Sequence, residues 1–128
     1  MHRLSVSDHA TLYLQLAQVE LKLGHTAAAR ELLHEAQNRF SGTLQEGRVT
    51  IAQAMFAARQ DLDQALVLLR QVSVKSPFFV NARSQMAKLY LVELHHPAKY
   101  IACYEEVVEE QPSVQALVAL GEAYGVIG

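Results

Sequence analysis

The sequence predicts an all-α solenoid, a row of about seven antiparallel helices with three full helix pairs and the first helix of a fourth. The first observation behind this prediction is self-similarity along the chain at a period close to 34 residues. The second is that Gly and Pro are scarce, with 6 and 3 among 128 residues. The third is that just over half of the residues are hydrophobic, which supplies enough apolar surface for one continuous core.

The repeat is clearest near the C-terminus, in the string LVALGEAY at residues 117–124. A large apolar residue is followed three places later by Leu-Gly, and Tyr follows three places after the glycine, which is typical of the first helix in a helix-pair repeat. Counting back from the glycine in steps of 34, 34 and 36 residues brings the pattern to residues 87, 53 and 17. The main positions of the pattern in these first helices are Ala17, Ala87, Tyr90, Gly121 and Tyr124.

The second helix of each pair is expected to carry a small residue and, four places later, a large one. Ala29 and Leu33 fill these places in the first pair, and Ala65 and Leu69 fill them in the second. In the third pair Tyr100 stands at the small place, one residue later than the period requires, so the turn near 95–97 is expected to hold an extra residue. Antiparallel helices cross closely where a small side chain lies at the contact, and the residues expected there are Ala17, Ala29, Ala36, Ala65 and Gly121.

Seven helices are expected in order along the chain, at 9–23, 26–40, 46–59, 62–75, 79–93, 97–111 and 114–126. Gly24 ends the first helix. The polar stretch 41–43 forms the longest connection between the first and second pairs. Pro77 ends the fourth helix, because the residue before a proline disfavours helical backbone.

Prolines and a serine delimit the last two helices. Pro97 suits the first turn of the sixth helix, Pro112 ends that helix, and Ser113 is expected to cap the seventh. The chain is therefore predicted to be a single repeat array over 1–128, with repeats at 10–41, 42–77 and 78–112 and half a repeat at 113–128.

Over residues 10–128 these motifs resemble tetratricopeptide repeats. The connecting strings RFSGT at 39–43, RVTIA at 48–52 and SPFF at 76–79, together with LGEAY, are similar to the C-terminal half of the large tetratricopeptide-repeat subunit of intraflagellar transport complex A. This resemblance implies a scaffold in the complex that carries cargo back along the ciliary axoneme, present in the cytoplasm and the cilium. Members of that family are far longer, so the chain is expected to be a fragment or a short isoform.

Composition disfavours several other classes of protein. The formal net charge is -2 and basic residues do not cluster, which argues against a nucleic-acid partner. No apolar stretch reaches the roughly 18 residues of a membrane span, so membrane insertion is not expected. Cys103 is the single cysteine, which favours a reducing, intracellular setting.

Residues with potential chemistry have simpler structural interpretations. His95 and His96 are adjacent in a turn and lack a further ligand at zinc-type spacing, so no metal site is expected. Cys103 lies between tyrosines at helical spacing, which favours packing over reactivity. The glutamates at 105, 106, 109 and 110 are interpreted as a solvated helix face that could meet a basic partner. The chain is therefore predicted to be non-enzymatic and to bind no cofactor.

The concave groove of the array is the predicted binding site for other proteins, because the first helix of each repeat lines it. The residues expected to face it are Leu14, Gln18, Leu21, Thr50, Ala54, Ala57, Ser84, Lys88 and Leu91. They are mainly apolar or small, which disfavours a clamp for a terminal carboxylate and favours an apolar helix. Two hypotheses follow: a scaffold within a ciliary transport complex, or a free-standing adaptor that binds short peptide or helical segments.

Overall fold

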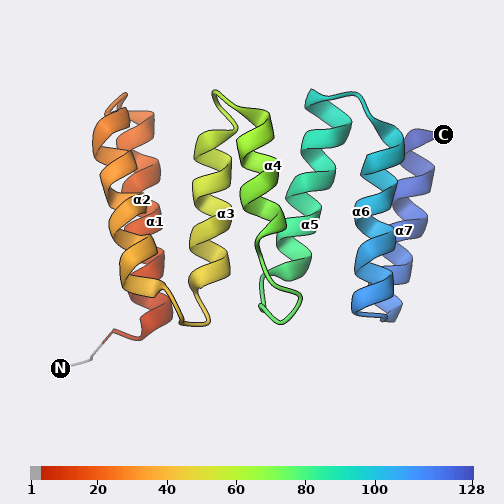
Figure 1. Ribbon diagram of the computed structural model, residues 1–128, viewed down its shortest axis with the longest axis horizontal. Coiled ribbons are helices and arrows are strands. Elements are labelled where there is room, and N and C mark those ends of the chain that lie inside the picture. The colour runs from red at the N-terminus through yellow and green to blue at the C-terminus, as the bar shows by residue number, and fades with distance from the viewer. Residues whose placement is uncertain (1–3) are drawn as a thin grey trace.

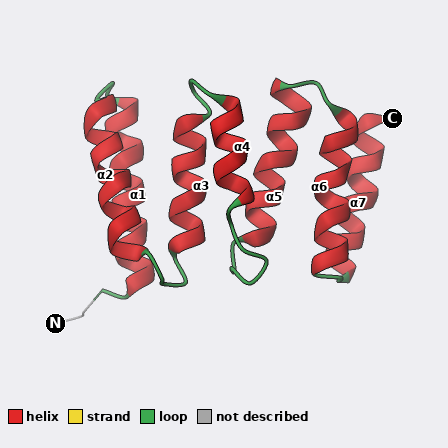
Figure 2. Ribbon diagram, in the orientation of Figure 1, coloured by secondary structure: helices red, strands yellow, loops and turns green. Residues whose placement is uncertain are grey.

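The computed structural model describes residues 4–128, and this part of the chain is a row of helices without a β-strand (Figure 1, Figure 2). The expected all-α solenoid is thereby confirmed. The elements are α1 (Val6–Lys22), α2 (Thr26–Phe40), α3 (Glu46–Ala57), α4 (Leu62–Arg70), α5 (Phe79–Lys88), the π-helical turn η1 (Leu89–Glu93), α6 (Pro97–Glu110) and α7 (Val114–Ile127).

The helices form antiparallel pairs, α1 with α2, α3 with α4, and α5 with α6, and α7 packs beside α6 (Figure 1). Consecutive pairs stand side by side, so α1 and α7 lie at opposite ends of the row. The largest core cluster runs through the second half of the row and takes a buried residue from each helix in turn: Ala54, Leu69, Met86, Ile101 and Ala123. One core therefore joins α3 to α7, as expected for stacked repeats that cannot bury their apolar faces alone.

Side-chain caps determine where α1 and α7 begin. The backbone N–H of Asp8 donates to the Ser5 hydroxyl, and the Asp8 carboxylate accepts from the backbone N–H of Ser5, which makes a capping box. Helix α1 consequently begins at Val6, before the expected start at residue 9. The predicted cap of the last helix is confirmed, since the Ser113 hydroxyl accepts from the backbone N–H of Ala116 at 3.0 Å.

The prediction that the fourth helix extends to residue 75 is wrong, because α4 ends at Arg70. The Leu69 carbonyl, which a longer helix would pair with the N–H of Ser73, instead accepts from the backbone N–H of Val72 and from the Arg83 guanidinium. The Ser73 hydroxyl accepts from the backbone N–H of residue 75, which also competes with helical hydrogen bonds. A distant arginine and a local serine therefore end the helix before Pro77 is reached.

The extra residue of the third pair lies in η1 rather than in the following turn at 95–97. The backbone N–H of Leu94 donates to the carbonyl of Leu89, five residues back, at 3.0 Å. A π-helical turn holds one residue more than an α-helical hydrogen bond allows. It thus absorbs the additional residue found between Ala87 and Tyr100, and α6 pairs with α5 in the ordinary way.

The small residues of the repeat pattern lie at buried positions in the first three repeats. Ala29, Ala36, Ala65 and Ala87 are fully buried and Ala17 is 3% exposed, whereas Tyr90 is half-buried at the edge of the core and Pro77 and Pro112 lie in exposed loops. The expectation that Gly121 lies at a close helix contact is wrong in this chain. Gly121 is exposed, a Cβ there would meet nothing within 4 Å, and Tyr124 on the same face is 49% exposed.

Two glycines in helices are expected to respond to alanine with opposite signs. A Cβ at Gly47 in α3 would lie 2.5 Å from the Ser76 hydroxyl oxygen and 3.2 Å from a Val72 methyl, in the loop after α4. We expect Gly47→Ala to lower the free energy of unfolding by about 1–3 kcal/mol through overpacking. Gly121→Ala is the matched control and should raise it by about 0.5–1 kcal/mol through helix propensity. Urea denaturation followed by circular dichroism measures both, and effects of the same sign would contradict the packing described for Gly47.

Candidate protein-binding surface

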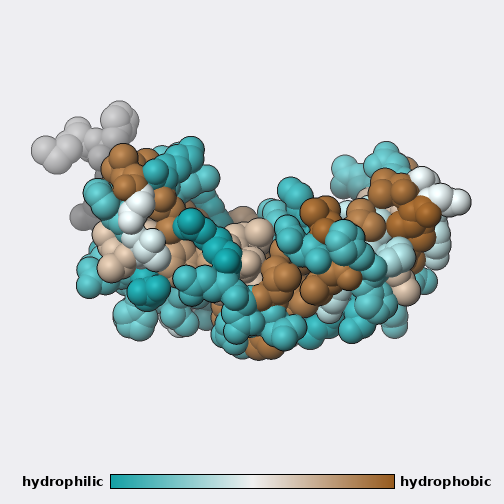
Figure 3. Space-filling view, turned by 90° about the horizontal axis from the view of Figure 1, so that it is seen from above, coloured by the Kyte–Doolittle hydropathy of each residue, from teal (hydrophilic) through white to brown (hydrophobic). Residues whose placement is uncertain are grey.

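An apolar groove lies between α1 and α3, and three of the predicted groove residues line it. Leu14, Gln18 and Leu21 of α1 face Met55 and Phe56 of α3 across a cavity of about 280 Å³. The side chain of Leu33 on α2 also lines the cavity, together with two alanines. Seen from above, the array is a shallow crescent with apolar side chains gathered along it (Figure 3). Apolar side chains therefore make up most of the lining of this cavity.

A second cavity, of about 320 Å³, occupies the corresponding place in the third repeat. Ser84, another predicted groove residue, lines it from α5, with Tyr104 and Val107 of α6 and Ala116 of α7. Both cavities thus lie between consecutive first helices, with the intervening second helix also lining them. The repeat architecture therefore presents two apolar pockets along the array.

The remaining predicted groove residues are not gathered into these pockets. Thr50 lines a different cavity, of about 390 Å³, formed with the loops around residues 41–44 and 71–77. Ala54 is a correction: it is fully buried in the core, so its methyl group offers no surface to a partner. Ala57 and Leu91 are half-buried, with Leu91 packed against the core, and Lys88 is exposed.

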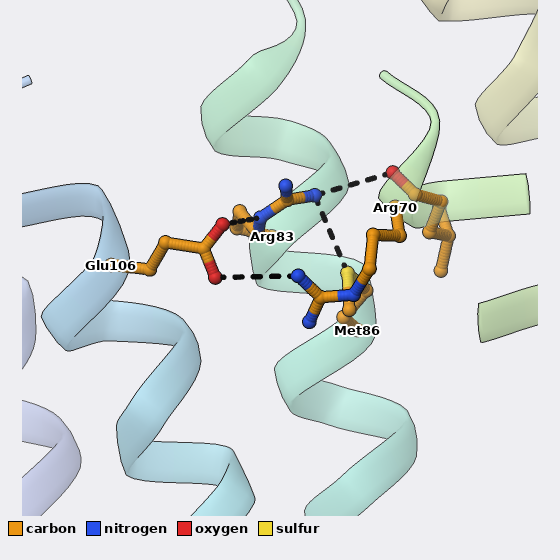
Figure 4. Close-up of polar contacts among 5 residues, drawn as sticks. Arg70, Arg83, Met86 and Glu106 are labelled. Atoms are coloured by element: carbon orange, nitrogen blue, oxygen red, sulfur yellow. Dashed lines mark hydrogen bonds and ion pairs between the residues drawn. The ribbon is translucent and has the colours of Figure 1, made fainter. Parts of the chain in front are cut away.

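The buried guanidinium of Arg83 was missed by sequence reasoning (Figure 4). Its side chain is only 5% exposed, and its Nε donates to Glu106 Oε1 at 2.8 Å. Its Nη1 donates to the Leu69 carbonyl at 3.3 Å and contacts Met86 Sδ at 3.5 Å, and the group lies 4.7 Å from the centroid of the Phe79 ring. These contacts compensate the buried positive charge of Arg83 and hold its guanidinium in one position.

The Arg83 cluster ties three helices together. Arg83 on α5 caps the C-terminal end of α4, and Glu106 on α6 also pairs with Arg70 of α4 at 3.6 Å. A positive group beside the last carbonyls of a helix is favourable. The repeat pattern does contain an indication that Arg83 is buried and paired. Arg83 stands at the place that Tyr13 and Val49 occupy in the two earlier repeats, and a charged residue at a core position needs a buried partner.

Cys103 and the paired histidines have structural roles here. Burial raises the pKa of the Cys103 thiol to about 11, which favours the neutral thiol at physiological pH. The backbone N–H of Lys99 donates to His96 Nδ1 at 3.3 Å, so His96 caps α6, and His95 adopts a positive φ of 51° in the turn before it. Both histidine positions therefore shape the connection between η1 and α6.

Across residues 4–128, His, Cys, Asp and Glu side chains nowhere form a group of three that could hold a metal ion. Nor does any helix in the described part of the chain have the length and apolar character needed to cross a membrane. Buried side-chain nitrogen and oxygen atoms in the same part all have hydrogen-bond partners.

Comparison with known proteins places this architecture among long repeat proteins. Residues 1–107 match the family described as tetratricopeptide repeat protein 21 ARM repeat. Tetratricopeptide repeat protein 21B of Mus musculus is 40% identical over 126 residues, which cover 96% of this chain and 10% of that relative. The Homo sapiens protein of the same name is 37% identical over 124 residues, covering 96% and 9%.

A second group of relatives matches over nearly the same span. Tetratricopeptide repeat protein 21A of Mus musculus is 33% identical over 119 residues, which cover 92% of this chain and 9% of that relative. The chain therefore spans about a tenth of the length of the curated relatives it matches.

Proposed function

The chain belongs to the tetratricopeptide repeat protein 21 family, and from this premise we propose that it is a non-enzymatic scaffold for protein–protein interactions. Its partners are other proteins, namely subunits of intraflagellar transport complex A, and its role lies in retrograde ciliary transport and cilium assembly. It acts in the cytoplasm and the cilium. The ciliary part of the proposal rests on the similarity of the connecting strings at 39–43, 48–52 and 76–79 to the large tetratricopeptide-repeat subunit of that complex.

The observation that carries the proposal is the repeated apolar pocket between consecutive first helices. Leu14 and Leu21 line the pocket at α1 and α3, and Ser84 lines its counterpart at α5 and α7. Each pocket can hold a large apolar side chain of a partner helix, since an amphipathic helix binds by placing its apolar anchors in hydrophobic pockets. Recognition of this kind requires no reacting group.

We expect changes in the α1–α3 pocket to remove partners selectively. Tagged residues 1–128 are expressed in ciliated cells, and co-purified proteins are quantified by mass spectrometry. Capture of transport-complex subunits should fall at least about tenfold for Leu14→Ser combined with Leu21→Ser, since the loss of one or two buried apolar contacts is worth about 1–3 kcal/mol each. The exposed Gln18→Arg, which cannot disturb the core, should act in the same direction by placing a charge at the mouth of the pocket.

Val67→Ser is the matched control, because Val67 lies on the second helix α4 and is 53% exposed. It should leave capture unchanged, and circular dichroism checks that every variant is folded. Unaltered capture by the folded pocket variants would contradict the proposed groove. Capture of isolated peptides through the same pocket, without any transport-complex subunit, would instead support the free-standing adaptor.

A further inference from the structure

The connection between α4 and α5, over residues 71–78, carries a serine that is followed directly by proline, Ser76 and Pro77. Of the prolines in the chain, at 77, 97 and 112, Pro77 is the one that follows a hydroxyl-bearing residue. Ser76 is half-buried, and Lys75 and Pro77 on either side of it are exposed. Because a residue before proline favours an extended backbone, this stretch can extend into an enzyme cleft without unwinding either flanking helix.

The Ser76 hydroxyl lies against α3 and serves as a hydrogen-bond acceptor. Its oxygen accepts from the backbone N–H of Phe78 at 3.0 Å. The oxygen fits there because the neighbouring residue of α3 is Gly47, where a Cβ would come within 2.5 Å of it. In the described part of the chain the hydroxyl proton is not donated to a partner, so the oxygen can lose it without breaking a hydrogen bond of the fold.

Ser76 also lines the polar cavity of about 390 Å³ described above, between the loops that precede α3 and α5. Side chains that can donate hydrogen bonds, among them Ser41, Thr43 and Lys75, share this lining. Across residues 4–128, the ion pairs leave the Lys75 ammonium without a carboxylate partner. Glu46 is the acidic residue of the lining. The space next to the Ser76 hydroxyl therefore has room and polar surroundings for a phosphoryl group.

We propose that Ser76 is a phosphorylation site for a proline-directed protein kinase. Such a kinase accepts serine before proline because proline has no backbone N–H that would need a partner in the cleft. The Ser76 oxygen attacks the γ-phosphorus of Mg-ATP, and its new bond to phosphorus forms as the bond to the leaving oxygen of ADP breaks. The hydroxyl proton passes to the catalytic aspartate of the kinase. The inference does not depend on the proposed scaffold function.

A phosphate on Ser76 lies close to the first turns of two helices. Helix α3 begins beside Gly47 and α5 begins at Phe79, and neither first turn has a side-chain cap. Phosphate oxygens are favourable near helix N-termini, where they accept from backbone N–H groups. Lys75 adds to this attraction and Glu46 opposes it. We expect phosphorylation to raise the melting temperature by about 2–5 °C at low salt and by less at high salt.

The site is tested by incubating purified residues 1–128 with a cyclin-dependent kinase and Mg-ATP and mapping the product by tandem mass spectrometry. A single phosphoryl group should appear on Ser76, and Ser76→Ala should abolish it. Pro77→Ala should slow the reaction at least about tenfold, because the regained N–H is left without a partner in the kinase cleft. Ser41→Ala is the matched control: Ser41 is exposed beside the same cavity but precedes glycine, so the rate should not change. Circular dichroism checks that each variant is folded.

Melting of the fully phosphorylated chain tests where the phosphate lies. Lys75→Ala should reduce the rise in melting temperature that phosphorylation causes, whereas Lys88→Ala, exposed at the other end of α5, should leave that rise unchanged.

Three results would overturn the inference. The first is absence of phosphate on Ser76 of the folded chain, including the case in which an isolated peptide of residues 70–81 is phosphorylated, because the connection would then be closed to the kinase. The second is an equal rate for Pro77→Ala and the unaltered chain. The third is a lower melting temperature after phosphorylation, which would show that the cavity excludes the phosphate.

Discussion

Replacing Glu106 by alanine is expected to lower the free energy of unfolding by about 3 kcal/mol. The change removes the carboxylate to which Arg83 Nε donates at 2.8 Å, while the guanidinium remains 5% exposed between α4, α5 and α6. An uncompensated buried charge is costly because water cannot replace the lost partner without opening the helix contacts. Urea denaturation followed by far-ultraviolet circular dichroism gives the change directly.

Glu105→Ala provides the control on the same helix, because Glu105 is exposed and should cost less than about 0.5 kcal/mol. Arg83→Met should cost less than Glu106→Ala, since it removes the charge together with its need for a partner and keeps most of the buried volume. Equal effects of the two glutamate changes, or a larger loss for Arg83→Met, would contradict a buried charge that depends on Glu106.

Leu69→Ala is expected to lower the free energy of unfolding by about 3 kcal/mol, within the roughly 2–5 kcal/mol typical of large-to-small changes in a core. Leu69 is fully buried and belongs to the cluster that joins α3 to α7, so the deleted atoms leave a cavity bounded by several helices. Its carbonyl is also the group that Arg83 caps. The effect should appear as one cooperative transition that moves to lower urea concentration.

Val67→Ala is the matched change two residues earlier in α4, where the side chain is 53% exposed. It deletes similar apolar atoms from a position that water already reaches, so the expected cost is below about 0.5 kcal/mol. Similar losses for Leu69→Ala and Val67→Ala would show that the repeat register assigned to α4 is wrong.

The repeat period predicted much of the fold because apolar spacing decides which side of each helix is buried. The second helix was expected at 26–40 and α2 spans Thr26–Phe40; the buried alanines at 29, 36 and 65 follow from the same spacing. Three groove residues of α1 also line one pocket, as their shared helical face implied. Local pattern is sufficient where one helix contacts the next along the chain.

Features that depend on contacts between residues far apart in the sequence could not be predicted from the repeat period. The end of α4 at Arg70 is set by the Arg83 guanidinium from α5 and by the Ser73 hydroxyl, neither of which changes the apolar period. Ala54 was expected in the groove, yet it is fully buried, because α3 is packed on several sides. Gly121 matches the repeat pattern, but a Cβ there would meet nothing within 4 Å. The pattern predicts which residue type suits a close helix contact, and it does not show whether another helix lies against that position.

The π-helical turn η1 has a consequence for how such arrays change length over evolution. One extra residue in an α-helix would rotate everything after it by about 100°, because each turn holds 3.6 residues. In η1 the Leu94 N–H reaches back to the Leu89 carbonyl, and the insertion is confined to the last turn before the loop at 94–96. Single-residue insertions at the end of a first helix are thus tolerated without disturbing the units that follow. Related arrays can drift in repeat length by one residue at a time while preserving the order in which their helices stack.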